Sequence, residues 1–256
     1  MRKIALIIIF LISINNLKAQ DYTFRKNIDK NSLFDASVKR LPESMREEYT
    51  KEYKNGNEQS KEFLLFMISM PKSSKIELIS NFENKKAEIQ NLKNEYLKLV
   101  PKNYFVEIEF EAESKILNVS EQITIKIYKT KTENSKENNV LKRNDNLELV
   151  SQNWNLKPNS KELDEILKTL NWTSQTLMEI KKLLKEANCI SIENGKVTTI
   201  GFARSGMGLY SYKIFETELT PKQKAEYNNG CEYIYYKDKI VLEYGGGAVG
   251  PQCFEE

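Results

Sequence analysis

Glu232 and Glu243 form the first pair of residues that could do chemistry. They lie on either side of Lys237-Asp238, a turn-like dipeptide between two runs of strand-forming residues. If the turn is centred on this dipeptide, the two glutamates face each other directly across a β-hairpin. Facing carboxylates destabilise a sheet, so we expect a cation such as Arg204 or Lys213, a raised pKa or a metal to offset their repulsion.

A carboxylate pair is also what general acid/base catalysis requires. One functional hypothesis is therefore a carboxylate-based hydrolase that uses Glu232 and Glu243 near Arg204. Two alternatives remain open. Both carboxylates could point into water, or the turn could hold an odd number of residues, which would cancel the pairing.

The segment Arg204-Ser205-Gly206-Met207-Gly208 is the second candidate site. Glycines let backbone N–H groups approach a ligand closely, and an arginine can hold a carboxylate or a phosphate. Arg204, Ser205, Gly206 and Gly208 are the candidate binding residues. The alternative is a tight turn between two strands, because the segment lacks the GK[ST] spacing of a phosphate-binding loop.

The three cysteines, Cys189, Cys231 and Cys253, all lie in the last quarter of the chain. In an exported protein we expect one disulfide and one free thiol. We favour Cys231–Cys253, which would tether the glycine-rich tail 245–253 to a strand, and Cys189–Cys231 is the alternative. The density of glycine predicts that this tail follows a tight path, closing over the sheet or lining a site.

Several kinds of catalytic and metal site are excluded because the chain contains no histidine. These include Ser-His-Asp and Cys-His catalysis and every histidine-ligated metal. Glu107, Glu109 and Glu111 alternate along a strand and could hold a divalent cation. Strand carboxylates lack the loop oxygens of a calcium site, however, so we expect a solvated face there, and we expect no metal and no cofactor.

Residues 20–100 are predicted to be helical. Apolar residues recur at helical spacing between Pro42, Pro71 and Pro101, and Ser74 with Glu77 has the spacing of a capping box. Residues 101–150 change to a period of two, which predicts a β-hairpin followed by a mobile polar loop from about residue 130.

Residues 151–256 are predicted to form an α+β domain. Two helices cover residues 159–188, with Asn159 capping the first and Thr173 or Ser174 the second. An antiparallel meander follows, and Asn194-Gly195 is its strongest hairpin signal. The predicted fold class is thus α+β: a helical N-terminal region, then a helix pair packed on an antiparallel β-meander that ends in the glycine-rich tail.

Residues 1–19 are predicted to be a secretory signal peptide. Arg2 and Lys3 precede an apolar run at 4–12, and Ala19 fits cleavage before Gln20. The leader holds three of the 39 Lys+Arg and no acidic residue, so the mature chain has 36 basic and 36 acidic residues. This balance argues against nucleic-acid binding.

The main functional hypothesis is a non-catalytic binding or interaction protein, periplasmic or secreted, with no transmembrane segment in the mature chain. Its partner would be an unknown protein or small ligand. The absence of histidine and of a recognised catalytic motif favours this hypothesis over the hydrolase.

Overall fold

The computed structural model describes residues 23–130, 147–246 and 250–254. The predicted leader, residues 131–146 of the predicted polar loop and residues 247–249 of the glycine-rich tail lie outside these ranges. Within the described ranges, no helix is both long and apolar enough to cross a membrane.

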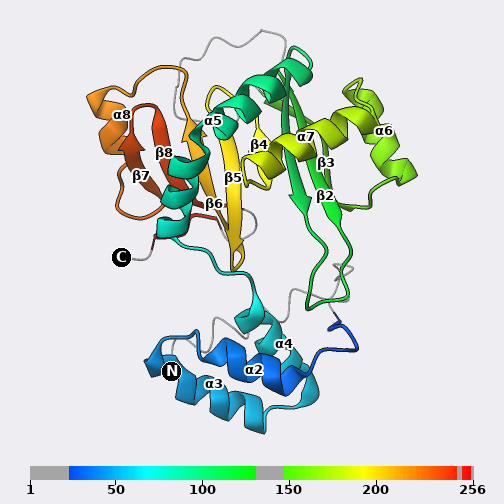
Figure 1. The fold of residues 1–256 in the computed structure, drawn as a ribbon, viewed down its shortest axis with the longest axis vertical. Helices are drawn as coiled ribbons and strands as arrows, with labels where there is room; N and C mark the ends of the chain where they lie inside the picture. The colour runs from blue at the N-terminus through cyan, green and yellow to red at the C-terminus, as the bar shows by residue number, and fades with distance from the viewer. Residues whose placement is uncertain (1–22, 131–146, 247–249, 255–256) are drawn as a thin grey trace.

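Three N-terminal helices form a small unit below the sheet (Figure 1). They are α2 (Lys30–Val38), α3 (Glu43–Asn55) and α4 (Glu58–Ser69). The unit has its own small core, which consists of Phe34, Leu41, Leu64, Leu65 and Ile68. Because this core is separate from the one under the sheet, we treat these helices as one body, the α2–α4 unit.

The long helix α5 (Lys75–Leu99) belongs to the sheet and not to the α2–α4 unit. It starts at the predicted capping box of Ser74 and Glu77 and is kinked at Lys85, whose backbone is non-helical. Most of its predicted apolar stripe is buried, from Phe82 to Tyr96, whereas Ile76 at its start is 77% exposed. The stripe is therefore the core face of a packed helix.

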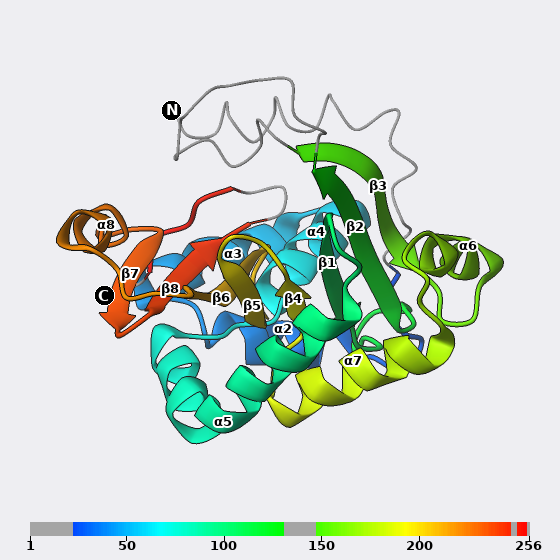
Figure 2. The ribbon, with the colours of Figure 1, turned by 90° about the horizontal axis from the view of Figure 1, so that it is seen from above.

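Eight strands form one antiparallel sheet in the order β3-β2-β1-β4-β5-β6-β8-β7, which confirms the α+β class. Helices α5 and α7 lie side by side on one face (Figure 2). The sheet joins the strands of segment 101–150 to those of segment 151–256. The strands are β1 (Tyr104–Glu111), β2 (Gln122–Thr130), β3 (Leu147–Leu156), β4 (Ser191–Glu193), β5 (Thr198–Ser205), β6 (Gly208–Ile214), β7 (Tyr233–Lys237) and β8 (Ile240–Gly245).

Three further helices connect the strands: α6 (Lys161–Thr169), α7 (Ser174–Glu186) and α8 (Pro221–Glu226). Thr173 caps α7 as predicted, but Ser160 and not Asn159 caps α6. Asn159 has φ of +61° and therefore cannot take the extended conformation of an N-cap. Helix α8 was not predicted, although Thr220, Pro221 and Gln223 form a capping box with proline at the first helical position.

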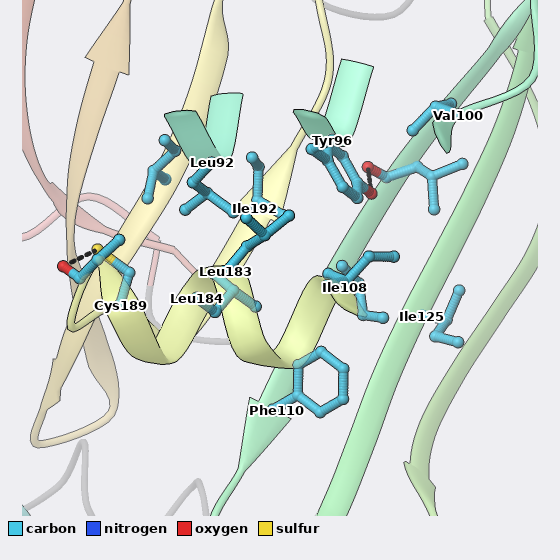
Figure 3. Close-up of a cluster of buried hydrophobic side chains, with 14 of the residues drawn as sticks. Leu92, Tyr96, Val100, Ile108, Phe110, Ile125, Leu183, Leu184, Cys189 and Ile192 are labelled. Atoms are coloured by element: carbon cyan, nitrogen blue, oxygen red, sulfur yellow. Dashed lines mark hydrogen bonds between the residues drawn. The ribbon is translucent and has the colours of Figure 1, made fainter. Parts of the chain in front are cut away.

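The main core lies between the sheet and α5 and α7 (Figure 3). Leu92 and Tyr96 of α5 and Leu183 of α7 pack over Ile108 of β1 and Ile192 of β4. Inside this layer, the Tyr96 hydroxyl donates to the Val106 carbonyl at 2.9 Å. Apolar residues at every second position of the central strands thus face the helices, as their predicted period requires.

Candidate functional site

The sheet face opposite α5 and α7 carries most of the predicted site residues. Side chains alternate along a strand, so the neighbours of Ile108 and Ile192 point to this second face. We call it the polar face. Two adjacent rows of paired residues define it, namely Thr124, Glu109, Ser191, Gly201, Ser211, Glu243 and Tyr233, and Lys126, Glu107, Glu193, Thr199, Lys213, Val241 and Tyr235.

The predicted direct pairing of Glu232 with Glu243 is wrong by one residue. Glu243 faces Tyr233, because a bulge between Tyr235 and Lys237 adds a residue to one side of the hairpin. Glu232 precedes β7, and its carbonyl accepts a hydrogen bond from the Tyr244 N–H at 2.9 Å. The sequence had left open an odd-numbered turn, but the turn itself holds two residues, Asp238 and Lys239, and the bulge in β7 is what cancels the pairing.

Lys213 is the cation that offsets Glu243. Its Nζ lies 3.0 Å from a Glu243 carboxylate oxygen, and the two side chains are only 10% and 13% exposed. The same ammonium lies 5.8 Å from the centre of the Tyr233 ring, within reach of a cation–π contact. The predicted offset by a neighbouring cation is therefore present, although Arg204 takes no part in it.

Tyr233 lies near both predicted carboxylates. Its pKa is raised first by burial, then by the negative charges of Glu243 and Glu232, and also by hydrogen bonding to both carboxylates. Each carboxylate thus favours the protonated form of the Tyr233 hydroxyl. Glu232 and Glu243 both act on Tyr233, but they do not face each other across the hairpin.

Arg204 binds Glu109 instead. Its Nε donates to Glu109 Oε1 at 2.7 Å, and Glu109 is only 2% exposed. Burial raises the pKa of Glu109, while the Arg204 charge acts in the opposite direction. The expectation that this row of glutamates is solvated is therefore wrong at Glu109. The guanidinium of Arg204 compensates the charge of Glu109 and so makes the burial of Glu109 possible.

The row of three glutamates does not form a described metal site. Glu107 forms an ion pair with Lys126 at 2.8 Å, and Glu109 is bound to Arg204. Within the described ranges, no group of three or more histidine, cysteine, aspartate or glutamate residues is arranged to hold a metal ion.

The predicted site residues therefore fall into two separate clusters. Strands β4, β5 and β6 lie between Glu109 on β1 and Glu243 on β8. At about 4.8 Å per strand spacing, their backbones are roughly 19 Å apart. Because the Arg204 guanidinium reaches Glu109, it points away from Glu243.

The Ser205–Gly208 segment forms the turn between β5 and β6, which was the alternative to a ligand loop. Ser205 Oγ donates to the Ser73 carbonyl at 3.1 Å and accepts from the Ser73 N–H at 3.2 Å. The Gly206 N–H donates to the Pro71 carbonyl at 2.8 Å. These polar groups thus hold the linker between α4 and α5.

Gly208, the last of the predicted binding residues, is needed for packing. A Cβ atom there would lie 2.8 Å from the Tyr244 ring and 3.4 Å from the side chain of Gln252. Gly208 therefore allows the aromatic residue of β8 and the C-terminal tail to approach β6 closely.

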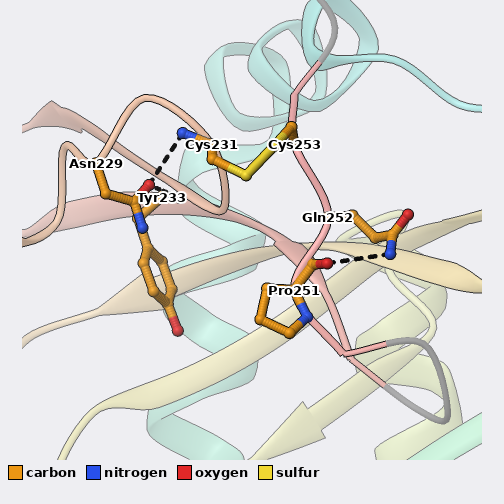
Figure 4. The surroundings of a disulfide bond; sticks show 6 residues. All are labelled: Asn229, Cys231, Tyr233, Pro251, Gln252 and Cys253. Atoms are coloured by element: carbon orange, nitrogen blue, oxygen red, sulfur yellow. Dashed lines mark hydrogen bonds between the residues drawn. A yellow bond between two sulfur atoms is a disulfide. The ribbon is translucent and has the colours of Figure 1, made fainter.

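The predicted disulfide is confirmed between Cys231 and Cys253 (Figure 4). It ties the tail to the loop before β7. Cys189 is the free thiol, and burial raises its pKa to about 12. Because such a thiol stays protonated near neutral pH, it is a poor nucleophile.

Comparison with protein-family models, with curated proteins and with solved structures finds no match for this chain. The functional argument therefore rests on the geometry of the polar face.

The sequence analysis missed the exposed apolar residues of β3. Tyr128 pairs with Leu149, and Lys126 pairs with Gln152. By alternation, Leu149 and Trp154 share the polar face, where they are 50% and 58% exposed. The apolar residues around Val150 and Trp154 were the available signal, but which face they occupy depends on register shifts in β3 that no local pattern predicts.

Proposed function

We propose that this chain is a non-catalytic binding protein that binds a protein partner on the polar face, next to β3. The observation that carries the proposal is the exposure of Trp154 and Leu149 beside a row of paired charges. Large exposed apolar side chains with polar neighbours mark interaction surfaces, and tryptophan and arginine are enriched among the residues that dominate binding energy. Arg204 and the Lys126–Glu107 pair supply fixed charges near this apolar end.

Export to the periplasm or to the medium is part of the proposal. The predicted leader supports it, and so does the Cys231–Cys253 disulfide, since structural disulfides persist in oxidising compartments. The test of this part is the N-terminus of the protein isolated from its native cells. Cleavage before Gln20 is expected, and retention of Met1 would contradict it.

The binding proposal is tested with two single variants of the chain that starts at Gln20. Trp154→Ala removes the exposed ring on the polar face. Met178→Ala is the matched control, since Met178 is 57% exposed on α7, on the other side of the sheet. Wild type and both variants are immobilised and exposed to native envelope proteins, and the captured partner is then purified and titrated against each.

The expected result is a loss of affinity of at least about tenfold for Trp154→Ala, since buried tryptophans at interfaces are worth 2 kcal/mol or more. Met178→Ala should bind like the wild type. Equal affinity of all three proteins would contradict the use of this face, and a larger loss for Met178→Ala would move the interface to the helices.

The carboxylate-based hydrolase is the second candidate, because Glu232 and Glu243 both lie near enough to Tyr233 to raise its pKa. Two neighbouring carboxylates could act as general acid and general base, whereas the raised pKa of Tyr233 makes its hydroxyl a weak proton donor. Glycoside and ester substrates are tested with the wild type, Glu232→Gln and Glu243→Gln. Turnover that either substitution abolishes would support this candidate, and turnover unchanged by both would contradict it.

A further inference from the structure

The linker between the α2–α4 unit and the sheet is fixed at one turn. Pro71 and Ser73 bind the Ser205–Gly206 turn through three hydrogen bonds of 2.8 to 3.2 Å. We call these four residues the linker anchor. A second attachment joins Thr23–Arg25 to the loop between β1 and β2, where the Asn118 N–H donates to the Thr23 carbonyl at 2.7 Å.

The linker anchor is in direct contact with Tyr244 of β8. The Tyr244 hydroxyl donates to the Ser205 carbonyl at 3.1 Å. Its ring stacks on Tyr210 with 4.2 Å between the ring centres. The position of this hydroxyl, and hence part of the support for Ser205, depends on how firmly the stack of Tyr210 and Tyr244 is held.

The C-terminal tail holds that stack. Phe254 is buried against both rings, with centres 5.5 Å from Tyr210 and 5.9 Å from Tyr244. The Gln252 N–H also donates to the Tyr244 carbonyl at 3.1 Å. The tail therefore supports Tyr244 through both its backbone and its ring.

The disulfide keeps the tail in place. Cys253 is bonded to Cys231, and the Phe254 N–H donates to the Cys231 carbonyl at 3.1 Å. Opening the disulfide would remove the covalent link between the tail and the loop before β7 and leave the noncovalent contacts of Gln252 and Phe254. Contacts thus run without a break from Cys231–Cys253 through Phe254, Tyr244 and Ser205 to Ser73.

We infer that the Cys231–Cys253 disulfide is a redox-sensitive device that controls how firmly the α2–α4 unit is attached to the sheet. The reductant would be a dithiol. It transfers two electrons and two protons, becoming a disulfide while Cys231 and Cys253 become thiols. Phe254 then leaves the stack, the Tyr244 hydroxyl loses its fixed position, and the linker anchor opens. The α2–α4 unit, whose core is separate, is then held to the sheet by the Thr23–Arg25 attachment and can move about it as one body.

Hydrogen exchange measured by mass spectrometry on the chain from Gln20 tests this inference. Oxidised protein is compared with protein reduced by dithiothreitol, at the amides of Ser73 and Gly206. Reduction is expected to speed exchange at both amides about tenfold or more, the effect of opening a protected local structure. Amides of β1 and α7 should keep their protection.

Two variants of the oxidised protein separate the proposed route from general loosening. Tyr244→Phe removes only the hydroxyl that contacts Ser205, and Phe254→Ala removes the ring that holds the stack. Both should speed exchange at Ser73 and Gly206 with the disulfide intact. Tyr235→Phe is the control, because its hydroxyl contacts the carbonyl of Asp238 at 3.5 Å, away from the anchor.

Faster exchange in the tail after reduction, with no change at Ser73 and Gly206, would overturn the inference. If reduction unfolds the whole sheet, the inference is tested with Tyr244→Phe and Phe254→Ala in their oxidised forms. Unchanged exchange at Ser73 and Gly206 in both variants would then overturn the inference. None of these outcomes depends on the partner proposed for the polar face.

Discussion

Arg204 and Glu109 form an ion pair that bridges the middle of the sheet, with 2.7 Å between Nε and Oε1. Arg204 lies on β5 and Glu109 on β1, so the pair spans the intervening strand β4. β4 is only three residues long, and it is the strand that joins the two halves of the sheet. The ion pair therefore reinforces the part of the sheet with the fewest paired residues.

Replacing Arg204 with methionine should destabilise the protein by about 3 kcal/mol at pH 8, since a buried carboxylate would lose its partner. The cost should shrink as the pH falls through the raised pKa of Glu109, because the protonated carboxyl no longer needs a cation. Urea unfolding at pH 8 and pH 5 measures both values. An equal cost at the two pH values would show that Glu109 is solvated in the folded protein.

Glu109→Gln is the complementary variant. The folded-state pKa of Glu109 lies above the ordinary value of 4.5, so the folded protein binds this proton more tightly than the unfolded chain does. Its contribution to stability is thus full below pH 4.5 and declines as the pH rises through the folded pKa. As the pH rises from 4.5 to 7, the free energy of unfolding should fall less for Glu109→Gln than for the wild type, which urea unfolding at each pH measures.

The order of the elements and one disulfide could be predicted from the sequence. Apolar periodicity located α5, α7 and the β1–β2 hairpin, because burial of one face imposes that pattern wherever the element ends up. Cys231–Cys253 was favoured because it would tether a glycine-rich tail that directly follows a strand. The predictions of the helices and the hairpin depend only on the residue pattern within a short segment. The prediction of the disulfide depends only on which two cysteines are joined.

The partners of the charged residues could not be predicted in the same way. The β7–β8 register depends on a bulge after Tyr235, and one added residue changes which side chain faces Glu243. Arg204 and Glu109 are 95 residues apart in the chain and meet only because β4 pairs with β1. Long-range strand order determines such pairs, and the local pattern around each residue carries no information about it.

The Lys213–Glu243 pair should show strong coupling in a double-mutant cycle. Lys213→Met should cost about 3 kcal/mol, because it leaves Glu243 without its ion-pair partner beside Glu232 and Tyr233. Adding Glu243→Leu should recover most of that loss, since the buried charge is then gone as well. Unfolding free energies of the four proteins give the coupling. If each single variant lowers the free energy of unfolding by less than about 0.5 kcal/mol and the cycle shows no coupling, the Lys213–Glu243 pair is exposed to solvent.

Cys189 should be inert in the folded protein. With a pKa of about 12 it is ionised in roughly one molecule in 10,000 at pH 8, and its side chain is buried. Ellman's reagent should therefore find almost no thiol in the native oxidised protein and one thiol per chain in guanidinium chloride. In the Cys189→Ala variant, the reagent should find no thiol in either the native or the denatured protein. Rapid native labelling of the wild type would contradict the burial.

Gly201→Ala should destabilise the sheet by about 1 to 3 kcal/mol, the usual cost of overpacking. A Cβ atom there would lie 2.1 Å from Ser191 Oγ and 2.9 Å from a methyl carbon of Leu209. Ser191→Ala removes the closer atom and should restore part of the loss in the double variant. Ser211→Ala is the matched control. Ser211 pairs with Gly201 from the strand on the other side, and its side chain is not among the atoms nearest to the added Cβ. Equal rescue by both serine variants would mean that the strain is spread over the strand, and no rescue by either would assign it to Leu209.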